Sequence, residues 1–363
     1  DIEKVLERYG DERRTEIDLT ADPDLNMEDL IQDEDVLISI TQRGYIKRTP
    51  VAAYRIQGRG GKGLIGMSTR DKDELEHLFA AGTLNSILFF SNQGKVYTDK
   101  AYNIPEMGRT ARGTSLMNIL PLMPEERITA AIAVHDFEEG EYLTMITCKG
   151  RIKRVRSDVF ANVRPSGLIA LNLDDDDSLG WVKLTKGQQD LILVSEQGRG
   201  IRFSEDDVRP MGRTAAGVNA MRLDTWDRIA GADVATPEDD LLVITEKGYG
   251  KRTPLDEYRT QNRYGQGVRA MVLEPERTGH IVSARVVTRG DEVTCISANG
   301  IILRTAADAI SQQSRITRGV RVMDLRDGDS VASVAVVREG RLSRVNGEEE
   351  EAEIKPEDTA VLN

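Results

Sequence analysis

The strongest constraint on the fold of this chain is an internal repeat of about 50 residues that occurs six times. In each copy a β-rich run ends in one or two polar residues and a glycine, and a second run, partly apolar and partly basic, follows. The stretches are TQRGYIKRT (41–49), SNQGKVYT (91–98), TCKGRIKRV (147–155), SEQGRGIRF (195–203), TEKGYGKRT (245–253) and SANGIILRT (297–305). Because a unit of this size cannot bury its apolar face alone, the copies must pack against one another.

Two glycines mark every copy. The first glycines are separated by steps of 50, 56, 48, 50 and 52 residues, and they are Gly44, Gly94, Gly150, Gly198, Gly248 and Gly300. The second glycine follows at an offset of 19 in five copies and 17 in the third, at Gly63, Gly113, Gly167, Gly217, Gly267 and Gly319. Ten residues after the first glycine the side chain is always apolar or aromatic, at Tyr54, Ile104, Phe160, Val208, Tyr258 and Ile310. We expect these six side chains to anchor a connecting segment to the core.

The remaining parts of each copy also read as strands. Residues 128–147 and 280–297 are β-rich runs broken by a polar turn, which is typical of a strand, a turn and a second strand. About four short strands per copy, with no long helical period between them, predict an all-β fold. The fold class is a six-bladed, propeller-like disc of four-stranded antiparallel blades over residues 35–346. Residues 329–345 supply further strand material that closes the ring.

The two ends of the chain differ from the repeats. Residues 1–17 are charged and helix-prone, and an apolar stripe of Ile2, Val5, Leu6 and Tyr9 is typical of the end of a helix whose body lies upstream. Residues 18–34 are an acidic linker. Residues 347–363 are an acidic, low-complexity tail that we expect to be disordered and solubilising.

The composition excludes several classes of protein. Cys148 and Cys295 have no CxxC spacing, and the three histidines have no ligand spacing, so reduced thiols and no metal site are expected. There is no signal peptide, and no apolar run approaches the roughly 18 residues of a membrane span, which predicts a cytoplasmic protein. GxSxG and HExxH motifs are absent. The acidic run DDDD (174–177) reads as a solvated turn, with a cation site as the alternative.

Charge is strongly segregated along the chain. The formal net charge is −12, which by itself argues against a polyanionic partner. The six windows from three residues before the first glycine to the second glycine nevertheless hold 28 Lys and Arg against 11 Asp and Glu, and the remainder holds 21 against 50. This division suits a basic surface that holds a polyanion while the rest of the molecule repels it. The alternative is that polar turns simply collect solvated charge.

Arginine recurs at two places in the repeat. The turn arginines, fifteen residues after the first glycine, are Arg59, Arg109, Arg213, Arg263 and Arg315, with Arg164 within one residue of this place in the shortened third copy. The strand arginines, four residues after it, are Arg48, Arg154, Arg202, Arg252 and Arg304. An aspartate four residues later (Asp158, Asp206, Asp256 or Asp308) makes a salt bridge within the copy as good an explanation of the strand arginines as ligand contact. The turn arginines have no such acidic neighbour, which favours ligand contact. Further candidate rim contacts are Arg112, Arg318, Lys47, Lys153 and Lys251.

The stretch QGRGGKG (57–63) contains a literal GxGxxG. A dinucleotide-binding loop would open a helix, but the β-like LIGMST follows, and no GK[ST] is present for a P-loop. The remaining interpretation is a turn whose glycines let backbone N–H groups, Arg59 and Lys62 approach phosphates closely.

The six repeats, QGRGGKG and the upstream YGDERRTEI (9–17) together resemble the C-terminal domain of the A subunit of bacterial DNA gyrase. The signature box of that family corresponds to Gln57, Gly58, Arg59, Gly60, Gly61, Lys62 and Gly63. Gly58 departs from the family pattern, in which the second place is commonly basic. The resemblance implies a six-bladed β-pinwheel, in which neighbouring blades exchange strands and DNA wraps around a basic rim. The related domain of topoisomerase IV, an alternative, has a degenerate box or none.

The resemblance also implies function and partners. The domain is expected to bind and wrap duplex DNA chirally without reading sequence, and so to enable ATP-dependent negative supercoiling. It is expected to have no catalytic residue and no cofactor of its own, because ATP and Mg²⁺ serve the rest of the holoenzyme. The implied partners are double-stranded DNA and the gyrase B subunit, in an A2B2 assembly formed through the missing core, with this fragment monomeric and chromosome-associated. The rival interpretation is a propeller for protein interaction, which predicts aromatic hot spots, yet only 5% of residues are aromatic. The acidic tail then has a second interpretation, as a DNA mimic on the rim.

Overall fold

The computed structural model describes residues 2–10, 27–50, 73, 75–108, 110–137, 140–299 and 301–337. The predicted box at 57–63, Arg109 and the acidic tail at 347–363 lie outside the described residues. The chain divides into two units, residues 1–32 and residues 33–363. The first unit contains helix α1 (Ile2–Tyr9) and a 3-10 helix (Met27–Leu30). In α1 the apolar Ile2, Val5 and Tyr9 are exposed.

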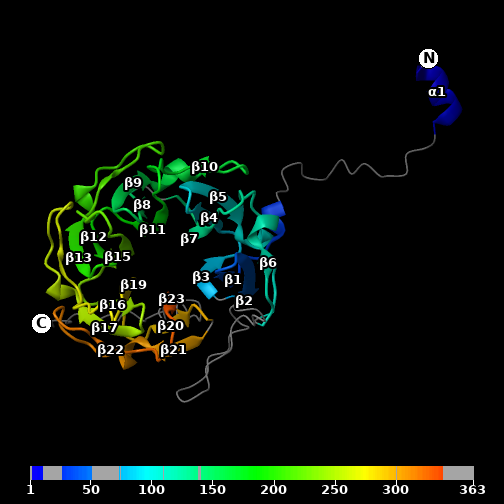
Figure 1. Cartoon of the computed structure of the whole chain (residues 1–363). Helices are drawn as coiled ribbons and strands as arrows, with labels where there is room; N and C mark the ends of the chain where they lie inside the picture. The colour runs from blue at the N-terminus through cyan, green and yellow to red at the C-terminus, as the bar shows by residue number, and fades with distance from the viewer. Residues whose placement is uncertain are drawn as a thin grey trace, which may run out of the picture. The chain divides into compact units, whose positions relative to one another are not determined.

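The second unit is a ring of six antiparallel sheets, which we call blades 1 to 6 in chain order (Figure 1). Each blade is built on a β-hairpin. The first hairpin strands are β1 (Asp35–Thr41), β4 (Ser86–Ser91), β8 (Tyr142–Thr147), β12 (Asp190–Ser195), β16 (Asp240–Thr245) and β20 (Glu292–Ser297). The second hairpin strands are β2 (Tyr45–Pro50), β5 (Lys95–Lys100), β9 (Arg151–Arg156), β13 (Arg199–Ser204), β17 (Tyr249–Pro254) and β21 (Ile302–Ala306).

The first hairpin strands read as continuous apolar runs because both of their faces are covered. In β12, Leu191 and Leu193 pack in one cluster with Ile152 of blade 3. The alternate residues Ile192 and Val194 pack in another cluster with blade 5. A strand with two buried faces needs apolar side chains at successive positions, whereas a half-exposed strand needs only every second one.

A third strand lies on the inner side of each hairpin and lines the centre of the ring. These inner strands are β3 (Leu75–Gly82), β7 (Ile128–Val134), β11 (Leu179–Thr185), β15 (Ile229–Ala235), β19 (Ile281–Val287) and β23 (Val331–Val337). Each contacts its two neighbours, and β23 of blade 6 contacts β3 of blade 1, so the circle is closed. Residues 331–337 therefore close the ring as the sequence predicts.

The outermost strand of each four-stranded blade is donated by the next copy of the repeat. The donated strands are β6 (Thr114–Ser115), β10 (Leu168–Ile169), β14 (Val218–Asn219), β18 (Val268–Arg269) and β22 (Val320–Arg321). They pair with β2, β5, β9, β13 and β17 respectively. In the described part of the chain, blade 6 has three strands, in the order β21-β20-β23. Strand exchange between neighbouring blades, implied by the resemblance, is thus observed.

Short 3-10 helices follow the second hairpin strands and begin the connection to the donated strand. They are Ala101–Asn103, Ser157–Phe160, Glu205–Asp207, Leu255–Glu257 and Ala307–Ala309, with a further one at Leu116–Asn118. The predicted anchors at the end of this connection are confirmed, because Ile104, Phe160, Val208, Tyr258 and Ile310 are at most 3% exposed. Tyr54 lies outside the described residues.

The two glycines of each copy are required for different structural reasons. Gly198 ends the three-residue hairpin turn of blade 4 with φ of 83°, a left-handed conformation that glycine adopts without strain. Gly267, a second glycine, also has positive φ, and a Cβ there would lie 2.4 Å from the backbone oxygen of Gly200 in the preceding blade. In this copy the second glycine therefore lets the donated strand approach the neighbouring hairpin.

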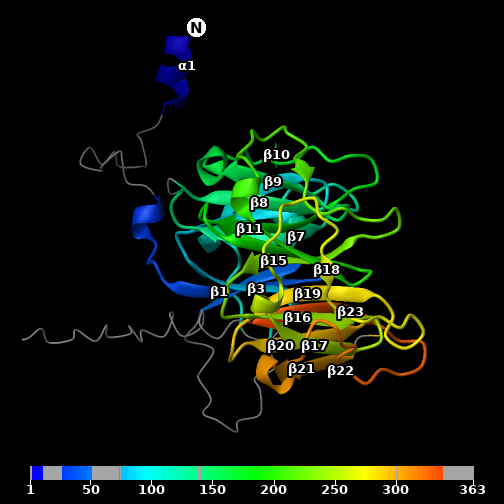
Figure 2. The same ribbon diagram turned by 90° about the vertical axis from the view of Figure 1, so that its left-hand side faces the viewer.

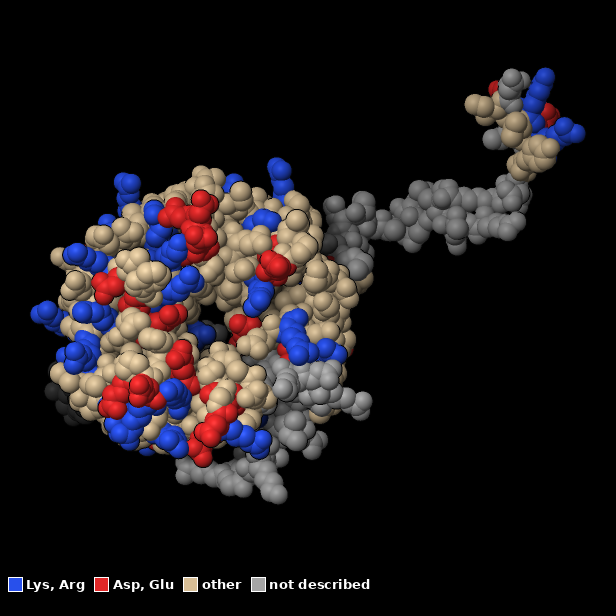
Figure 3. Space-filling model, in the orientation of Figure 1, with Lys and Arg blue, Asp and Glu red and all other residues tan. Residues whose placement is uncertain are grey.

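The centre of the ring is a cavity of about 640 Å³ lined by all six inner strands (Figure 3). Its charged side chains balance, since Glu76 and Asp233 face the same space as Lys183 and Arg285. Lys183 Nζ lies 2.7 Å from Asp233 Oδ1. Burial raises the pKa of Glu76 to about 7. A lining of mixed sign gives no basis for polyanion binding at the centre, so the outer edge is the relevant surface.

Candidate functional site

Cations recur at the outer edge of successive blades. There the first residue of the second hairpin strand lies opposite the last residue of the donated strand. We call these couples the outer-edge pairs, and they are Tyr45–Ser115, Lys95–Ile169, Arg151–Asn219, Arg199–Arg269 and Tyr249–Arg321 in blades 1 to 5. Blades 2 to 5 each have at least one cation in this pair. Figure 3 shows Lys and Arg side chains protruding along the outline of the ring.

Several outer-edge cations have acidic neighbours. Arg151 Nη1 lies 2.8 Å from Asp174 Oδ2, and its other nitrogens donate to backbone oxygens of the donated segment. Lys95 Nζ lies 3.9 Å from Glu126. In blade 5, Arg321 Nη1 lies 2.8 Å from Asp324. The pairs of Arg151 and Arg321 are exposed and therefore weak, so they lower the local positive potential without abolishing it, whereas Glu126 is buried.

Tyrosine rings hold guanidinium groups at the outer edges of blades 1 and 5. The guanidinium of Arg112, a predicted rim residue, lies 4.1 Å from the centre of the Tyr45 ring, and Arg112 is exposed. Arg318, at the equivalent place one residue before the second glycine, lies 5.8 Å from the Tyr249 ring and 3.0 Å from Glu274. A cation over an aromatic face keeps its charge while its conformational freedom falls.

Two of the turn arginines, Arg263 and Arg315, are braced by backbone oxygens, and Arg315 Nε also lies 3.9 Å from Glu257 Oε2, contrary to the expectation that this set has no acidic neighbour. Arg263 donates from Nε to the Asp207 oxygen and from Nη1 to the Asn219 oxygen, both at 2.9 Å. Arg315 Nη1 donates to the Arg269 oxygen at 3.1 Å. Each guanidinium thus ties its turn to the donated strand of the preceding copy. Sequence reasoning looked for acids at a fixed spacing and had no means of seeing carbonyl oxygens about 50 residues away.

The other turn arginines differ in placement. Arg164 is exposed and Arg213 is half-buried. Arg109 and Arg59 lie outside the described residues, as does the whole predicted box. Of the described turn arginines, Arg164 is therefore the one most open to a ligand.

The strand arginines form ion pairs, which supports the salt-bridge interpretation over ligand contact. The shortest contacts are Arg48–Glu106 at 3.5 Å, Arg154–Asp206 at 3.4 Å, Arg202–Asp190 at 2.8 Å, Arg252–Asp240 at 2.6 Å and Arg304–Glu292 at 2.8 Å. Three of these pairs lie within one copy, but their acids, Asp190, Asp240 and Glu292, stand on the first hairpin strand and not at the predicted place four residues after the arginine. Asp206 and Asp308 reach the arginine of the preceding copy, because the 3-10 helix that carries each of them packs against the neighbouring blade.

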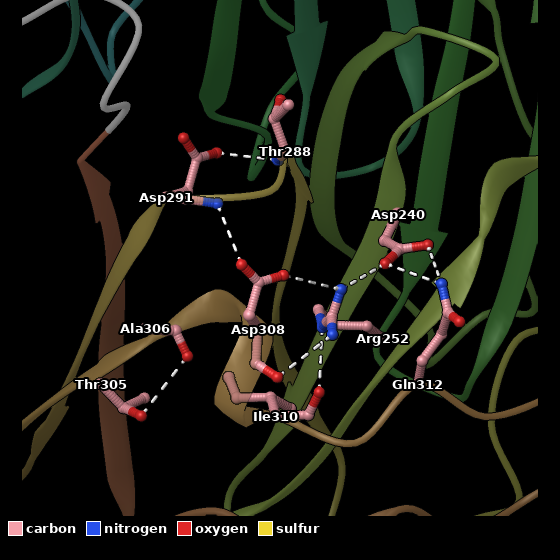
Figure 4. Close-up of polar contacts among 10 residues, drawn as sticks. Asp240, Arg252, Thr288, Asp291, Thr305, Ala306, Asp308, Ile310 and Gln312 are labelled. Carbon is pink, nitrogen blue, oxygen red and sulfur yellow. Dashed lines mark hydrogen bonds and ion pairs between the residues drawn. The ribbon is translucent and has the colours of Figure 1, made fainter.

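The joint between blades 5 and 6 shows this arrangement in detail (Figure 4). Arg252 Nη1 bonds Asp240 Oδ2, which also accepts a hydrogen bond from Gln312 Nε2. Arg252 Nε donates to the Ile310 oxygen at 2.9 Å, and Asp308 Oδ1 lies 3.7 Å from Nη1. Both side chains of the short pair are mostly buried, at 14% and 11% exposure. One guanidinium therefore links its own hairpin to the connection of the next copy.

Three predicted rim lysines lie inside the molecule, and we call Lys47, Lys153 and Lys251 the brace lysines. Each is 0% exposed. Lys47 Nζ donates to the Gly108 oxygen at 3.0 Å. Lys153 Nζ donates to the Ala170 and Arg213 oxygens. Lys251 Nζ donates to the Ser314 and Arg315 oxygens, both at 2.7 Å. Each ammonium group bonds the turn of the next copy, Lys153 also bonds Ala170 of its own copy, and none of the three reaches the surface.

A comparison of the six copies identifies the brace position. Lysine stands three residues after the first glycine in copies 1, 3 and 5, whereas Tyr97, Ile201 and Leu303 stand there in copies 2, 4 and 6. A column that alternates between lysine and large apolar residues is typical of a buried site whose charge is satisfied locally. Burial lowers the pKa of Lys153 and of Lys251 to about 8.

Sequence reasoning missed all five cations of the outer-edge pairs. Lys95, Arg151, Arg199, Arg269 and Arg321 belong neither to the turn arginines nor to the strand arginines. Their recurrence is visible in the sequence, because cations stand one residue after the first glycine in several copies and two residues after the second glycine in others. Within one copy these two positions are about 20 residues apart, but they belong to different blades. Because the later segment is donated to the preceding blade, a residue at the first position lies opposite one about 70 residues further along the chain, as Arg199 does opposite Arg269.

Six segments of the chain match the family model described as DNA gyrase C-terminal domain, beta-propeller, at residues 35–81, 85–135, 141–186, 189–236, 239–288 and 291–338. Each segment spans one hairpin and its inner strand, in agreement with the six blades. The chain belongs to the DNA gyrase C-terminal domain family. The fold predicted from the sequence, a six-bladed ring of antiparallel sheets, is confirmed.

Curated relatives are the A subunits of bacterial DNA gyrases. The gyrase A protein of Clostridium acetobutylicum is 44% identical over 354 residues, which are 98% of this chain and 42% of the relative. The gyrase A protein of Halalkalibacterium halodurans is 51% identical over 334 residues, which are 92% of this chain and 40% of the relative. The chain thus spans about two fifths of the length of these relatives.

Two solved structures resemble the ring closely. The C-terminal domain of DNA topoisomerase IV has a TM-score of 0.75 at 26% identity, covering 87% of this chain and 97% of that one. The DNA gyrase A C-terminal domain has a TM-score of 0.68 at 29% identity, covering 84% and 99%. Both folds fit the chain, so the sequence relatives rather than the fold favour gyrase.

The described residues also bear on the metal and membrane predictions. They contain no group of three or more His, Cys, Asp or Glu side chains placed to hold a metal ion. In the acidic run at 174–177, Asp174 pairs with Arg151 and Asp177 accepts a hydrogen bond from the Lys149 backbone nitrogen, as suits a structural turn. No described helix has the length and apolarity needed to span a bilayer.

Proposed function

We propose that the chain binds duplex DNA without sequence preference and bends it around the outer edge of the ring. The observation that carries this proposal is the recurrence of cations in the outer-edge pairs of blades 2 to 5. Equivalent cations in successive blades present positive charge at intervals along a curved path. Such an arrangement contacts phosphates, which position a duplex but carry no sequence information.

The physical basis is counterion release. Each phosphate neutralised by Lys or Arg releases condensed cations, which makes binding favourable and strongly dependent on salt. Bending a site of 20–30 bp costs on the order of 1 to 6 kcal/mol by elastic estimates, and several such contacts offset that cost. The net charge of −12 does not oppose this function, because the acidic excess lies outside the basic windows.

The box at 57–63 is proposed as the strongest contact, on its sequence. Its window holds six cations and no acid. In the proposed assembly the wrapped duplex is presented, with a positive hand, to the strand-passage core of gyrase. The core and the B subunit supply the catalytic tyrosine, ATP hydrolysis and Mg²⁺, and the result is negative supercoiling in the cytoplasm.

A plasmid topology assay tests the proposal. The chain is mixed with nicked plasmid, the nick is sealed by ligase, and the linking number is read on a gel after the protein is removed. We expect a shift that grows with protein and falls steeply with salt, and that is lost when residues 57–63 are replaced by alanine. An unchanged linking number with the wild-type chain at low salt would refute wrapping. A shift that survives the alanine replacement would refute the box assignment alone.

A further inference from the structure

One outer-edge pair differs from all the others in the described blades. In blade 4 two arginines, Arg199 of β13 and Arg269 of β18, are direct cross-strand partners. Both side chains are exposed. Figure 2 turns the ring so that the edge carrying blade 4 faces the viewer. Elsewhere in blades 1 to 5 an outer-edge cation is opposite a neutral residue.

The register brings the two side chains as close as a sheet allows. The amide of Ala270 donates to the Gly198 oxygen at 2.8 Å, just beyond the Arg199–Arg269 couple. Arg199 and Arg269 therefore do not bond each other through the backbone, because the hydrogen bonds are made by the residues on either side. Side chains of such a non-hydrogen-bonded pair approach more closely than those of the alternate, hydrogen-bonded pairs. Like charges placed directly opposite each other destabilise a sheet.

No acidic side chain relieves this repulsion in the part of the chain that the structure describes. Neither guanidinium has an ion pair or a side-chain hydrogen bond there, in contrast to Arg151 and Arg321, which pair with Asp174 and Asp324. The neighbouring turn adds order without neutralising charge, because Arg315 donates to the Arg269 backbone oxygen. The register thus places two cations side by side on the edge, with no acidic side chain among the described residues to compensate their charge.

We propose that Arg199 and Arg269 form a dedicated phosphate anchor on blade 4, at which the duplex is held more tightly than at the other described blades. This inference rests on the proposed function and adds to it the place of an anchor remote in sequence from the box. A phosphate group between the two guanidinium groups exchanges their mutual repulsion for two attractive, charge-assisted contacts. The pair is consequently worth more to binding than two isolated cations.

Variants of the two arginines test the anchor by affinity. A mixed-sequence duplex of about 20 bp, two helical turns, is titrated by fluorescence anisotropy at several salt concentrations. Arg199→Gln and Arg269→Gln should each weaken binding about tenfold near 0.1 M salt and reduce the salt slope by about 0.9. Arg321→Gln is the matched control, because it occupies the same strand position one blade later but pairs with Asp324. Its loss should be clearly smaller.

A second measurement separates binding from structure. Without DNA, Arg199→Gln should raise the thermal midpoint at low salt, and Arg199→Glu should raise it further by creating an attractive pair with Arg269. Both gains should disappear near 1 M salt, where the screening length is only about 3 Å. A residue that serves the fold alone would lower the midpoint instead.

The outcomes distinguish the two proposals. If the wild-type chain does not bind the duplex at low salt, the proposed function fails, and the anchor fails with it. If the wild-type chain binds but the blade 4 variants bind equally well, or lose no more affinity than Arg321→Gln, the anchor is refuted and the proposed function stands. Weaker binding together with a raised midpoint supports the anchor.

Discussion

Replacement of Arg252 by methionine should open the joint between blades 5 and 6. The change removes the 2.6 Å contact to Asp240, the 2.9 Å hydrogen bond to the Ile310 oxygen and the longer contact to Asp308. Asp240 is then left with Gln312 as its neighbour in the joint. The aliphatic part of methionine retains much of the packing, so the measured effect reports the polar contacts.

The expected cost follows from these contacts. A charged hydrogen bond contributes about 1.5 to 3 kcal/mol, and a buried oxygen left without its donor costs about 1 to 3 kcal/mol. Breaking one side of a buried ion pair costs about 3 to 5 kcal/mol overall. Arg252→Met should therefore reduce the free energy of unfolding by about 3 to 5 kcal/mol. The matched Arg321→Met variant should change the free energy of unfolding much less, because the side chain of Arg321 is 60% exposed and an exposed ion pair contributes little.

Urea denaturation and amide exchange provide the assay. Exchange is read at Gln313, whose amide bonds the Arg252 oxygen across the joint at 2.8 Å. Faster exchange there, with little change in blade 3, would localise the effect. The double variant Arg252→Met with Asp240→Leu should recover part of the loss, because no lone buried charge remains. A cost below about 1 kcal/mol accompanied by a large loss of DNA affinity would refute the structural role and make Arg252 a ligand contact.

Three further predictions concern packing and titration. Gly231→Val should destabilise the joint between blades 4 and 5 by about 1 to 3 kcal/mol, because even a Cβ at this position would lie 2.2 Å from the Ala284 oxygen. Gly212 has open space around it, so the control Gly212→Ala should change the urea midpoint little. Equal effects of the two substitutions would contradict the packing argument. Burial raises the pKa of the Cys148 thiol and raises the pKa of Cys295 to about 11. Both thiols should therefore resist Ellman's reagent at pH 8 until the chain is unfolded, and rapid labelling of the native chain would refute their protection. Burial lowers the pKa of Lys251 from 10.5 to about 8, so the native state releases this proton at a lower pH than the unfolded state does. The free energy of unfolding of the wild type, relative to that of Lys251→Met, should therefore rise between pH 8 and pH 10, by at most about 1.4 kcal/mol per pH unit. A fall in this difference, measured by urea denaturation, would contradict the lowered pKa.

The fold was predictable because its determinants are local and repeated. Each hairpin is specified by an apolar run, a polar turn and a glycine such as Gly198, all within ten residues. The anchors, for example Phe160 and Val208, were predictable for the same reason, since a buried apolar side chain recurs at one offset. Six copies of a weak local signal make a strong one.

The candidate site was less predictable because its contacts cross from one copy to the next. Arg154 pairs with Asp206 and not with Asp158, although Asp158 is only four residues away in the sequence. Lys153 donates a hydrogen bond to the turn of the following copy. A charged side chain read from sequence alone is assigned to the surface, whereas a ring of donated strands buries some cations and braces others with carbonyl oxygens. The contacts that remain open, such as the Arg199–Arg269 pair, appear only after the register of the donated strand is known.

Strand donation has a consequence for synthesis on the ribosome. Blade 4 is complete only when Arg269 has been made, about 70 residues after its partner Arg199, which takes roughly 4 to 14 s at ordinary translation rates. During that interval β13 has a bare edge, and bare edges pair with other chains. While blades 1 to 5 are being made, the nascent chain thus carries one unfinished blade at a time, and each of the next repeats protects its predecessor from aggregation before it is protected itself.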